Sequence, residues 1–136
     1  MSYLIDSDVL IYFIGGLPEA RQLIEGLLPS GVAISVIGYM ETIEGLPRSR
    51  HVGRAQSRFD SLLKEEPVMG LTIVEARRCA AIRADLRRAG RRVRSRGLDL
   101  LVAATALEHS LTLVTNNDAD YRDTSGLNLL PAQITP

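Results

Sequence analysis

The sequence predicts an α/β fold in which a short parallel sheet lies between two layers of helices. Short apolar segments alternate with amphipathic segments along the whole chain. In such an alternation each helix connects two parallel strands and covers one face of the sheet. The 136 residues suffice for one hydrophobic core, and neither an internal repeat nor a low-complexity stretch divides them. We therefore expect a single domain over residues 1–136, built as a three-layer sandwich.

The first strand is predicted at residues 3–5, which are apolar and short enough for a buried strand. The apolar run 9–14 fits either a continuation of that strand or a short helix, and the two glycines after it end it. Pro18 suits the first turn of a helix that continues to about Leu28.

The middle of the chain repeats the alternation. Residues 32–34 predict the second strand, and Ser35 is a suitable N-cap for a helix over 36–46. A polar amphipathic helix is expected over 50–66, before a third short strand at 68–71.

The last third of the chain holds the clearest signals. Thr72 and Glu75 have the spacing of a capping box, so a long helix is expected to begin there. Residues 98–109 predict a helix that is apolar on nearly all sides and therefore central. Residues 111–115 predict the clearest strand of the chain, and 128–130 fit an edge strand.

Composition excludes several classes of function. Cys79 is the only cysteine, so the chain has no internal disulfide and too few thiolate ligands for a zinc cluster. Aromatic residues make up 4% with no tryptophan, which disfavours binding of nucleic acid by base stacking. No apolar run has the length of a membrane span, and the N-terminal segment does not resemble a secretion signal. We expect a cytoplasmic protein.

Acidic residues follow the predicted strands where these strands end. Asp6 comes directly after the first strand, and Glu41 lies in the helix after the second. Asp99 begins the central helix, and Asp118 and Asp120 follow the strand at 111–115. Singly, most of these acids could cap a helix or lie in a turn. Because the carboxyl ends of parallel strands meet at one edge of a sheet, we expect them to converge there.

Converging carboxylates repel one another unless a cation neutralises them. Oxygen ligands select hard divalent ions, so the pattern predicts a Mg²⁺ or Mn²⁺ site suited to phosphodiester hydrolysis by a metal-activated water. Asp8 would cap the segment after it or add charge beside the metal. Ser35 and Thr115 end predicted strands and are expected to support the ligands without binding the metal.

Positive charge is concentrated in one stretch, although the formal net charge is zero. Its arginines are Arg77, Arg78, Arg83, Arg87, Arg88, Arg91, Arg92, Arg94 and Arg96. Arginine binds phosphate through a planar fork of donors. We expect Arg91, Arg92, Arg94 and Arg96, in the loop before Asp99, to contact a polyanionic substrate, whereas the arginines before that loop fit a solvated helix face equally well.

Three segments give the sequence a resemblance to the PIN-domain ribonucleases, specifically the VapC-type toxins of bacterial toxin–antitoxin pairs. They are YLIDSDVLI, ISVIGYMETIEG and LDLLVAATALEHSLTLVTNNDADY. The resemblance places the metal-binding acids of the family at Asp6, Glu41 and Asp99. The family usually has Asn at the position of Asp8. Its fourth acid corresponds to Asp118 or Asp120, with Asn117 as a further contact to metal or substrate.

The resemblance also implies function. It implies a Mg²⁺- or Mn²⁺-dependent endoribonuclease that cuts structured RNA, often tRNA or ribosomal RNA. It further implies a homodimer and a VapB-like antitoxin that blocks the acidic site.

Three alternatives use the same kind of acidic edge. A phosphatase of the haloacid-dehalogenase type also begins with Asp-x-Asp, but it needs a Thr where this chain has Leu10 and a Lys late in the chain, and Lys64 is the only lysine. A phosphate-accepting receiver domain needs a similar late Lys. A binding module of the same fold without catalysis would keep the arginines and show no metal-dependent cleavage.

Overall fold

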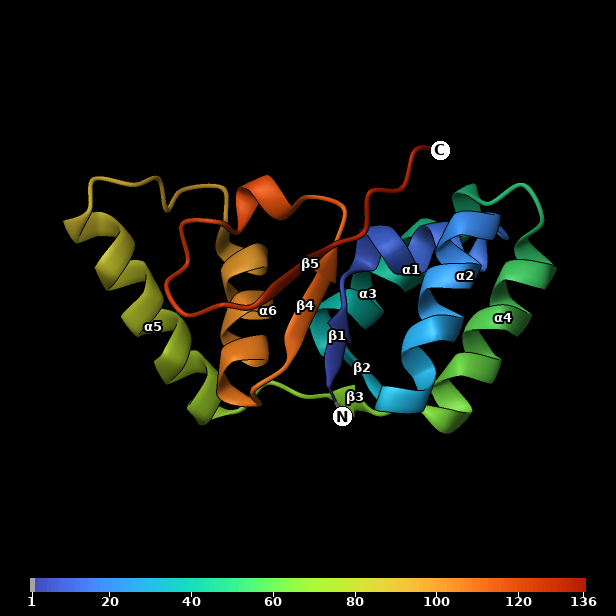
Figure 1. The fold of residues 1–136 in the computed structure, drawn as a ribbon, viewed down its shortest axis with the longest axis horizontal. Helices are drawn as coiled ribbons and strands as arrows, with labels where there is room; N and C mark the ends of the chain where they lie inside the picture. The colour runs from blue at the N-terminus through green and yellow to red at the C-terminus, as the bar shows by residue number, and fades with distance from the viewer. Residues whose placement is uncertain (1) are drawn as a thin grey trace.

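The computed structural model describes residues 2–136, and it confirms the predicted class of fold (Figure 1). Five parallel strands form one sheet in the order β3-β2-β1-β4-β5. The strands are β1 (Tyr3–Ile5), β2 (Val32–Ser35), β3 (Val68–Met69), β4 (Thr112–Thr115) and β5 (Leu129–Pro131). The helices are α1 (Ser7–Ile14), α2 (Pro18–Leu27), α3 (Val36–Gly45), α4 (Val52–Glu65), α5 (Ile73–Arg88) and α6 (Gly97–Glu108).

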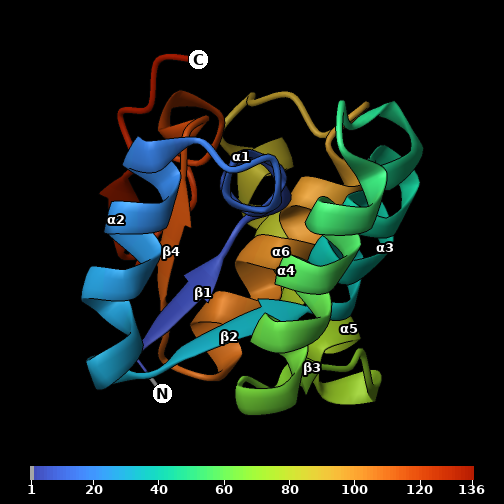
Figure 2. The ribbon, with the colours of Figure 1, turned by 90° about the vertical axis from the view of Figure 1, so that its right-hand side faces the viewer.

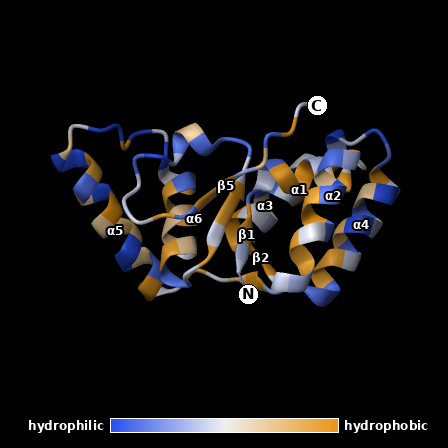
Figure 3. Ribbon diagram, viewed as in Figure 1, coloured by the Kyte–Doolittle hydropathy of each residue, from blue (hydrophilic) through white to orange (hydrophobic). Residues whose placement is uncertain are grey.

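The helices cover both faces of the sheet, as Figures 1 and 2 show. On one face α5 and α6 pack through Ile82, Leu86 and Leu100 against strand residues such as Leu113. On the other face α1, α2 and α4 enclose a second apolar cluster that includes Phe59. Figure 3 shows the strands mainly in hydrophobic colours, whereas the loop between α5 and α6 is mostly hydrophilic. No helix in the described part of the chain combines the length and apolar character that a bilayer crossing requires.

Local signals explain most element boundaries. The capping box of Thr72 and Glu75 forms as predicted and begins α5. The Ser35 hydroxyl accepts a hydrogen bond from the Gly38 amide at 2.9 Å and begins α3. The apolar run 9–14, which fitted either a strand or a helix, forms part of α1. The helix begins here because the Asp6 side chain caps it immediately after β1.

Three short helical turns and one short strand differ from the prediction. Residues 46–48 leave α3 as a 3₁₀ turn, since Pro47 cannot continue the α-helical hydrogen bonds. Further 3₁₀ turns lie at Leu28–Ser30 and at Asp118–Asp120. The third strand has only two residues, because Gly70 follows Met69.

All five strands point to the same edge of the sheet, at the top of Figure 1. The register pairs Ile5 with Val114, so Asp6 and Thr115 leave the sheet side by side. The Asp6 amide donates to the Val114 carbonyl at 2.9 Å, which fixes this pairing. We call this end of the sheet the acidic edge.

Candidate active site

Asp6 is buried at the acidic edge and held by uncharged donors. Only 6% of the residue is exposed. Its Oδ1 accepts the Ser7 amide at 2.9 Å, and its Oδ2 accepts the Thr115 hydroxyl at 2.8 Å and the Tyr121 hydroxyl at 3.2 Å. Within residues 2–136 no salt bridge reaches this carboxylate. Its charge is therefore oriented by the protein but not neutralised by it.

Asp8 ties the first turn of α1 to the end of β4. Its Oδ1 accepts the Val9 amide at 2.7 Å, and its Oδ2 accepts the Asn116 amide at 3.0 Å. The Thr115 hydroxyl lies 3.4 Å from the same Oδ2. Asp8 thus lies within the helix rather than before it, and it joins two segments that carry the acidic edge.

The electrostatics of the two carboxylates reflect burial and like charge. Burial, together with the neighbouring charges of Asp8 and Asp99, raises the pKa of Asp6 to about 7 despite the lowering effect of the hydrogen bonds from Thr115 and Ser7. Burial also raises the pKa of Asp8, with a contribution from Asp99. A cation at this edge would relieve the repulsion among the three carboxylates.

Glu41 and Asp99 line one pocket of about 700 Å³ beside these acids. The Ser7 hydroxyl donates to Glu41 Oε1 at 2.9 Å, and this contact joins α1 to α3 at the acidic edge. Asp99 lies in the first turn of α6. Three separate segments thus bring Asp6, Asp8, Glu41 and Asp99 to one end of the sheet.

Two side chains in this cluster were not predicted from the sequence. Ser7 contacts Glu41, and Tyr121 is 1% exposed with its hydroxyl beside both Asp6 and Asp99. Burial and the charges of the two carboxylates raise the pKa of Tyr121 above its ordinary value, so the phenol keeps its proton and acts as a donor. One sequence signal pointed to Tyr121, its place as the aromatic residue after Asp120, which by itself is typical of a core position.

The loop acids take up other contacts. Asp118 is ion-paired with Arg122. Asp120 is exposed, and its carbonyl accepts Arg96 Nη2 at 2.8 Å. Asn117 is exposed, and its amide donates to the Thr115 hydroxyl at 3.0 Å. Neither Asp118 nor Asp120 is among the hydrogen-bond partners of Asp6 or the charges that raise its pKa.

Arg96, which the sequence places among the substrate contacts, is buried and ion-paired within the protein. The guanidinium donates to both carboxylate oxygens of Asp123, at 2.9 and 2.7 Å, and to the carbonyls of Arg92 and Asp120. Hydrogen bonding to Asp123 raises the pKa of Arg96, and the same interaction lowers the pKa of Asp123. Arg96 therefore anchors the loop before α6 to the segment after Tyr121.

The other three arginines of the loop are exposed and stay available for a substrate. Arg91, Arg92 and Arg94 belong to the loop between α5 and α6, and Figure 1 shows this loop at the end of the molecule towards which the strands point. Arg92 Nη1 donates to the Arg94 carbonyl at 2.9 Å, which gives part of the loop a defined shape.

The acidic edge is not a complete metal site as it stands. Within residues 2–136 no three acidic, histidine or cysteine side chains are arranged to hold a metal ion. The donors around Asp6 and Asp99 are nevertheless the hard oxygen atoms that Mg²⁺ and Mn²⁺ prefer. Mg²⁺ in proteins typically binds one or two carboxylates and completes its shell with water and substrate phosphates. The carboxylates of Asp6 and Asp99 fit that pattern.

Comparison with known proteins gives concordant matches. The family model of the PIN domain matches residues 3–127. The chain is 26% identical over 127 residues to the tRNA(fMet)-specific endonuclease VapC of Shigella flexneri, covering 93% of this chain and 95% of that protein. It is 27% identical over 124 residues to ribonuclease VapC2 of Rickettsia felis, covering 90% and 91%.

Solved structures agree with these sequence matches. The crystal structure of VapBC2 from Rickettsia felis, bound to a DNA fragment from its promoter, has a TM-score of 0.81 at 26% identity, covering 96% of this chain and 98% of that one. DNA-bound VapBC from Salmonella typhimurium has a TM-score of 0.80 at 25% identity, covering 97% and 98%.

Proposed function

The chain belongs to the PIN domain family, and from that membership we propose that it is a VapC-type endoribonuclease that depends on Mg²⁺ or Mn²⁺. The observation that carries the proposal is the group of carboxylates at the acidic edge, where Asp6 is buried without an opposite charge. The curated relatives named above are both ribonucleases by name, which supports RNA as the substrate. The match over residues 3–127 favours a nuclease over a phosphatase or a receiver domain.

Asp6 and Asp99 would hold the ion, and Glu41, which lines the same pocket as Asp99, would complete the site. When bound, such an ion orients the scissile phosphate, acidifies a water and offsets charge on the leaving oxygen. Asp118 or Asp120 would join only after a change in the loop, since Asp118 is ion-paired with Arg122.

The side chains around the ligands would orient them. Thr115 and Tyr121 donate to the same oxygen of Asp6, which leaves Oδ1 with the Ser7 amide as its hydrogen-bond donor. Asp8 fixes the end of β4, on which Thr115 lies. Ser35 would act on the site indirectly by starting α3, the helix that bears Glu41. The exposed side chains that would bind the RNA backbone are Arg91, Arg92, Arg94 and Asn117.

Metal removal tests the proposal directly. Incubation with EDTA is expected to lower cleavage of RNA at least ~100-fold, and added Mg²⁺ or Mn²⁺ should restore it, because the carboxylates alone cannot stabilise charge on a phosphate. The measurement is the rate of RNA cleavage on denaturing gels. Cleavage that is unchanged in EDTA would contradict the metal dependence, and no cleavage under any condition would favour the binding-module alternative.

Tyr121→Phe tests whether the phenol positions the ligands. The ring stays buried, so we expect a loss of stability of about 1 kcal/mol or less. Affinity for Mn²⁺, measured by calorimetry, should fall about tenfold because Asp6 loses one of the donors that orient it. Tyr12→Phe, at a half-buried position of α1 that makes no contact with Asp6, serves as a control. Unchanged Mn²⁺ affinity would restrict Tyr121 to packing.

We also propose a VapB-like antitoxin and a homodimer as the assemblies of this protein, acting in the cytoplasm. The similar solved structures named above are VapBC complexes, which supports a partner of that kind. Light scattering of the purified protein, alone and with the product of a neighbouring small gene, would measure both assemblies.

A further inference from the structure

A second basic surface lies where α3 connects to α4, outside the arginine-rich stretch before α6. Residues 45–59 contain no acid, and their basic side chains are Arg48, Arg50, His51, Arg54 and Arg58. Arg48, Arg50, His51 and Arg58 line a cleft of about 470 Å³ together with the glycines Gly15 and Gly45. We call it the basic cleft. Among the described residues, no acidic side chain lines it.

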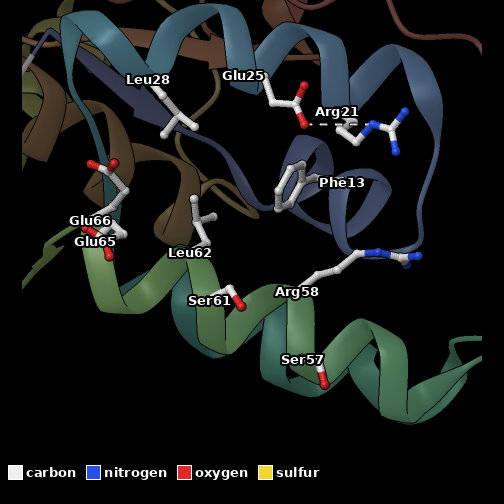
Figure 4. A pocket seen from close by; sticks show the side chains of 10 residues that line it. All are labelled: Phe13, Arg21, Glu25, Leu28, Ser57, Arg58, Ser61, Leu62, Glu65 and Glu66. Carbon is white, nitrogen blue, oxygen red and sulfur yellow. Dashed lines mark ion pairs between the residues drawn. The ribbon is translucent and has the colours of Figure 1, made fainter.

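Arg58 gives the basic cleft one fixed guanidinium. Its Nη1 donates to the Ile14 carbonyl at 2.8 Å, which holds the side chain across the end of α1. Figure 4 shows it reaching from α4 towards the turn after α1. A Cβ atom at Gly16 would lie 3.0 Å from Arg58 Nη1, so the glycine leaves room for the guanidinium to lie against the backbone. The φ of +85° at Gly16 also favours glycine.

The positive charge of the basic cleft is not balanced by the protein. None of the salt bridges found within residues 2–136 includes Arg48, Arg50 or Arg58. Arg48 and Arg50 are exposed. Uncompensated arginines around a concave surface attract phosphate groups and bind them through paired donors.

Two helices connect the basic cleft to the acidic edge. Asp8 lies in the first turn of α1, and Ile14 and Gly15 at the end of that helix line the cleft. Glu41 lies one turn before Gly45 in α3. At 1.5 Å per residue the cleft begins roughly 6–10 Å from these two acids, which is within about three nucleotides along one strand. Figures 1 and 2 place this connection and the loop before α6 at the same end of the molecule.

We propose that the basic cleft binds backbone phosphates of the RNA within about three nucleotides of the bond that is cut. The connection between α3 and α4 lies on the opposite side of β1 and β4 from the loop between α5 and α6, which contains Arg91, Arg92 and Arg94 (Figure 1). The strand would then be held on both sides of the acids, which fixes the position of the scissile phosphate. This inference rests on the proposed ribonuclease function. Phosphates are taken as the occupant because the cleft lies beside the acids of the proposed cleavage site, and an RNA strand bound there carries a phosphate at every nucleotide.

The test is RNA binding by the double variant Arg48→Gln/Arg50→Gln, measured in an Asp99→Asn background so that the RNA is not cleaved. Fluorescence anisotropy with a labelled single-stranded RNA of about 12 nucleotides, at several salt concentrations, gives the affinity and its salt dependence. Affinity should fall about tenfold. The slope of log K against log salt should decrease by about 1.4, or about 0.7 for each phosphate that is no longer neutralised. Both arginines are exposed, so the fold is retained.

The matched control is Lys64→Gln/Arg77→Gln in the same background. It removes the same charge from exposed positions near the end of α4 and the start of α5, at the opposite end of the molecule (Figure 1). Its affinity should stay within about twofold of the background. Equal losses of affinity in both double variants, or no loss in Arg48→Gln/Arg50→Gln, would overturn the inference and leave the ribonuclease proposal intact. Weaker binding of a protein partner with unchanged RNA affinity would also overturn it. Absence of RNA binding by the Asp99→Asn background would instead count against the ribonuclease proposal.

Discussion

Replacing Asp6 with asparagine is expected to abolish RNA cleavage and to stabilise the metal-free protein. Asparagine can still cap α1 through its carbonyl oxygen, and its amide group can donate to the Thr115 and Tyr121 hydroxyls, which accept as well as donate. The substitution removes the charge that would bind the cation. Cleavage should fall at least ~100-fold. The free energy of unfolding in EDTA near pH 8 should rise by roughly 2 kcal/mol, because the wild-type protein then carries a buried charge that the variant lacks. Each unit by which a pKa is raised disfavours the charged state by about 1.4 kcal/mol, and relaxation of the protein reduces the total.

The pH dependence of stability explains why removal of the Asp6 charge is expected to stabilise the metal-free protein. The native state holds the Asp6 proton more tightly than the unfolded chain, since its pKa is about 7 instead of the ordinary 3.8. Between these values the native state binds more protons, so the contribution of Asp6 to stability falls as the pH rises and stays low above pH 7. Asp6→Asn should lack this fall. Urea unfolding in EDTA at about pH 5 and about pH 8 measures the difference between variant and wild type.

Asp60→Asn is the matched control, because Asp60 is exposed on α4 and bonded only to Gln56. It should change neither cleavage nor the stability difference between the two pH values. Cleavage at the wild-type rate by Asp6→Asn would remove Asp6 from the site. A lower stability than wild type at the higher pH would contradict the account of its buried charge.

Replacing Arg96 with methionine is expected to cost roughly 3–5 kcal/mol of stability, since it leaves the Asp123 carboxylate without the partner that neutralises it. The side chain of Arg96 is only 6% exposed, so water does not replace its hydrogen bonds. Thermal and urea unfolding measure the loss of stability. The carbonyls of Arg92 and Asp120 lose their donors as well, so the loop before α6 should become more sensitive to protease.

Arg94→Met provides the control for Arg96→Met. Arg94 is exposed in the same loop, so its replacement should change stability by no more than about 0.5 kcal/mol. A double variant, Arg96→Met/Asp123→Leu, should recover part of the stability because no unpaired charge is then left behind. A loss below about 1 kcal/mol in Arg96→Met would show that the pair contributes little to the fold.

The sequence was sufficient to predict the order of strands and helices, because periodicity, caps and prolines are local signals. The capping box at Thr72 and the cap at Ser35 both formed as predicted. The run 9–14 could not be assigned, since an unbroken apolar stretch has neither a helical nor a strand period. Ser7 was missed for the same reason: its hydrogen bond to Glu41 exists only because α1 begins directly after Asp6.

The site was less predictable where partners are distant in sequence. In the sequence Arg96 is one of several basic residues of a predicted loop. Its burial depends on Asp123, which lies 27 positions later. Tyr121 reads as a core aromatic, and its hydroxyl reaches Asp6 across 115 positions. Composition and spacing carry no information about such pairs. The contact of Tyr121 with Asp6, for example, forms only when the parallel sheet brings β1 and β4 together.

Diffraction from crystals soaked in Mn²⁺, measured at the manganese absorption edge, would show directly whether Asp6 and Asp99 bind a divalent cation. We expect an anomalous peak at the acidic edge, within coordinating distance of the carboxylates of Asp6 and Asp99. We also expect the peak to be lost in crystals of Asp99→Asn. A fully soaked crystal with no peak at that edge, or a peak that persists in the variant, would contradict the assignment of these carboxylates as the ligands of a divalent cation.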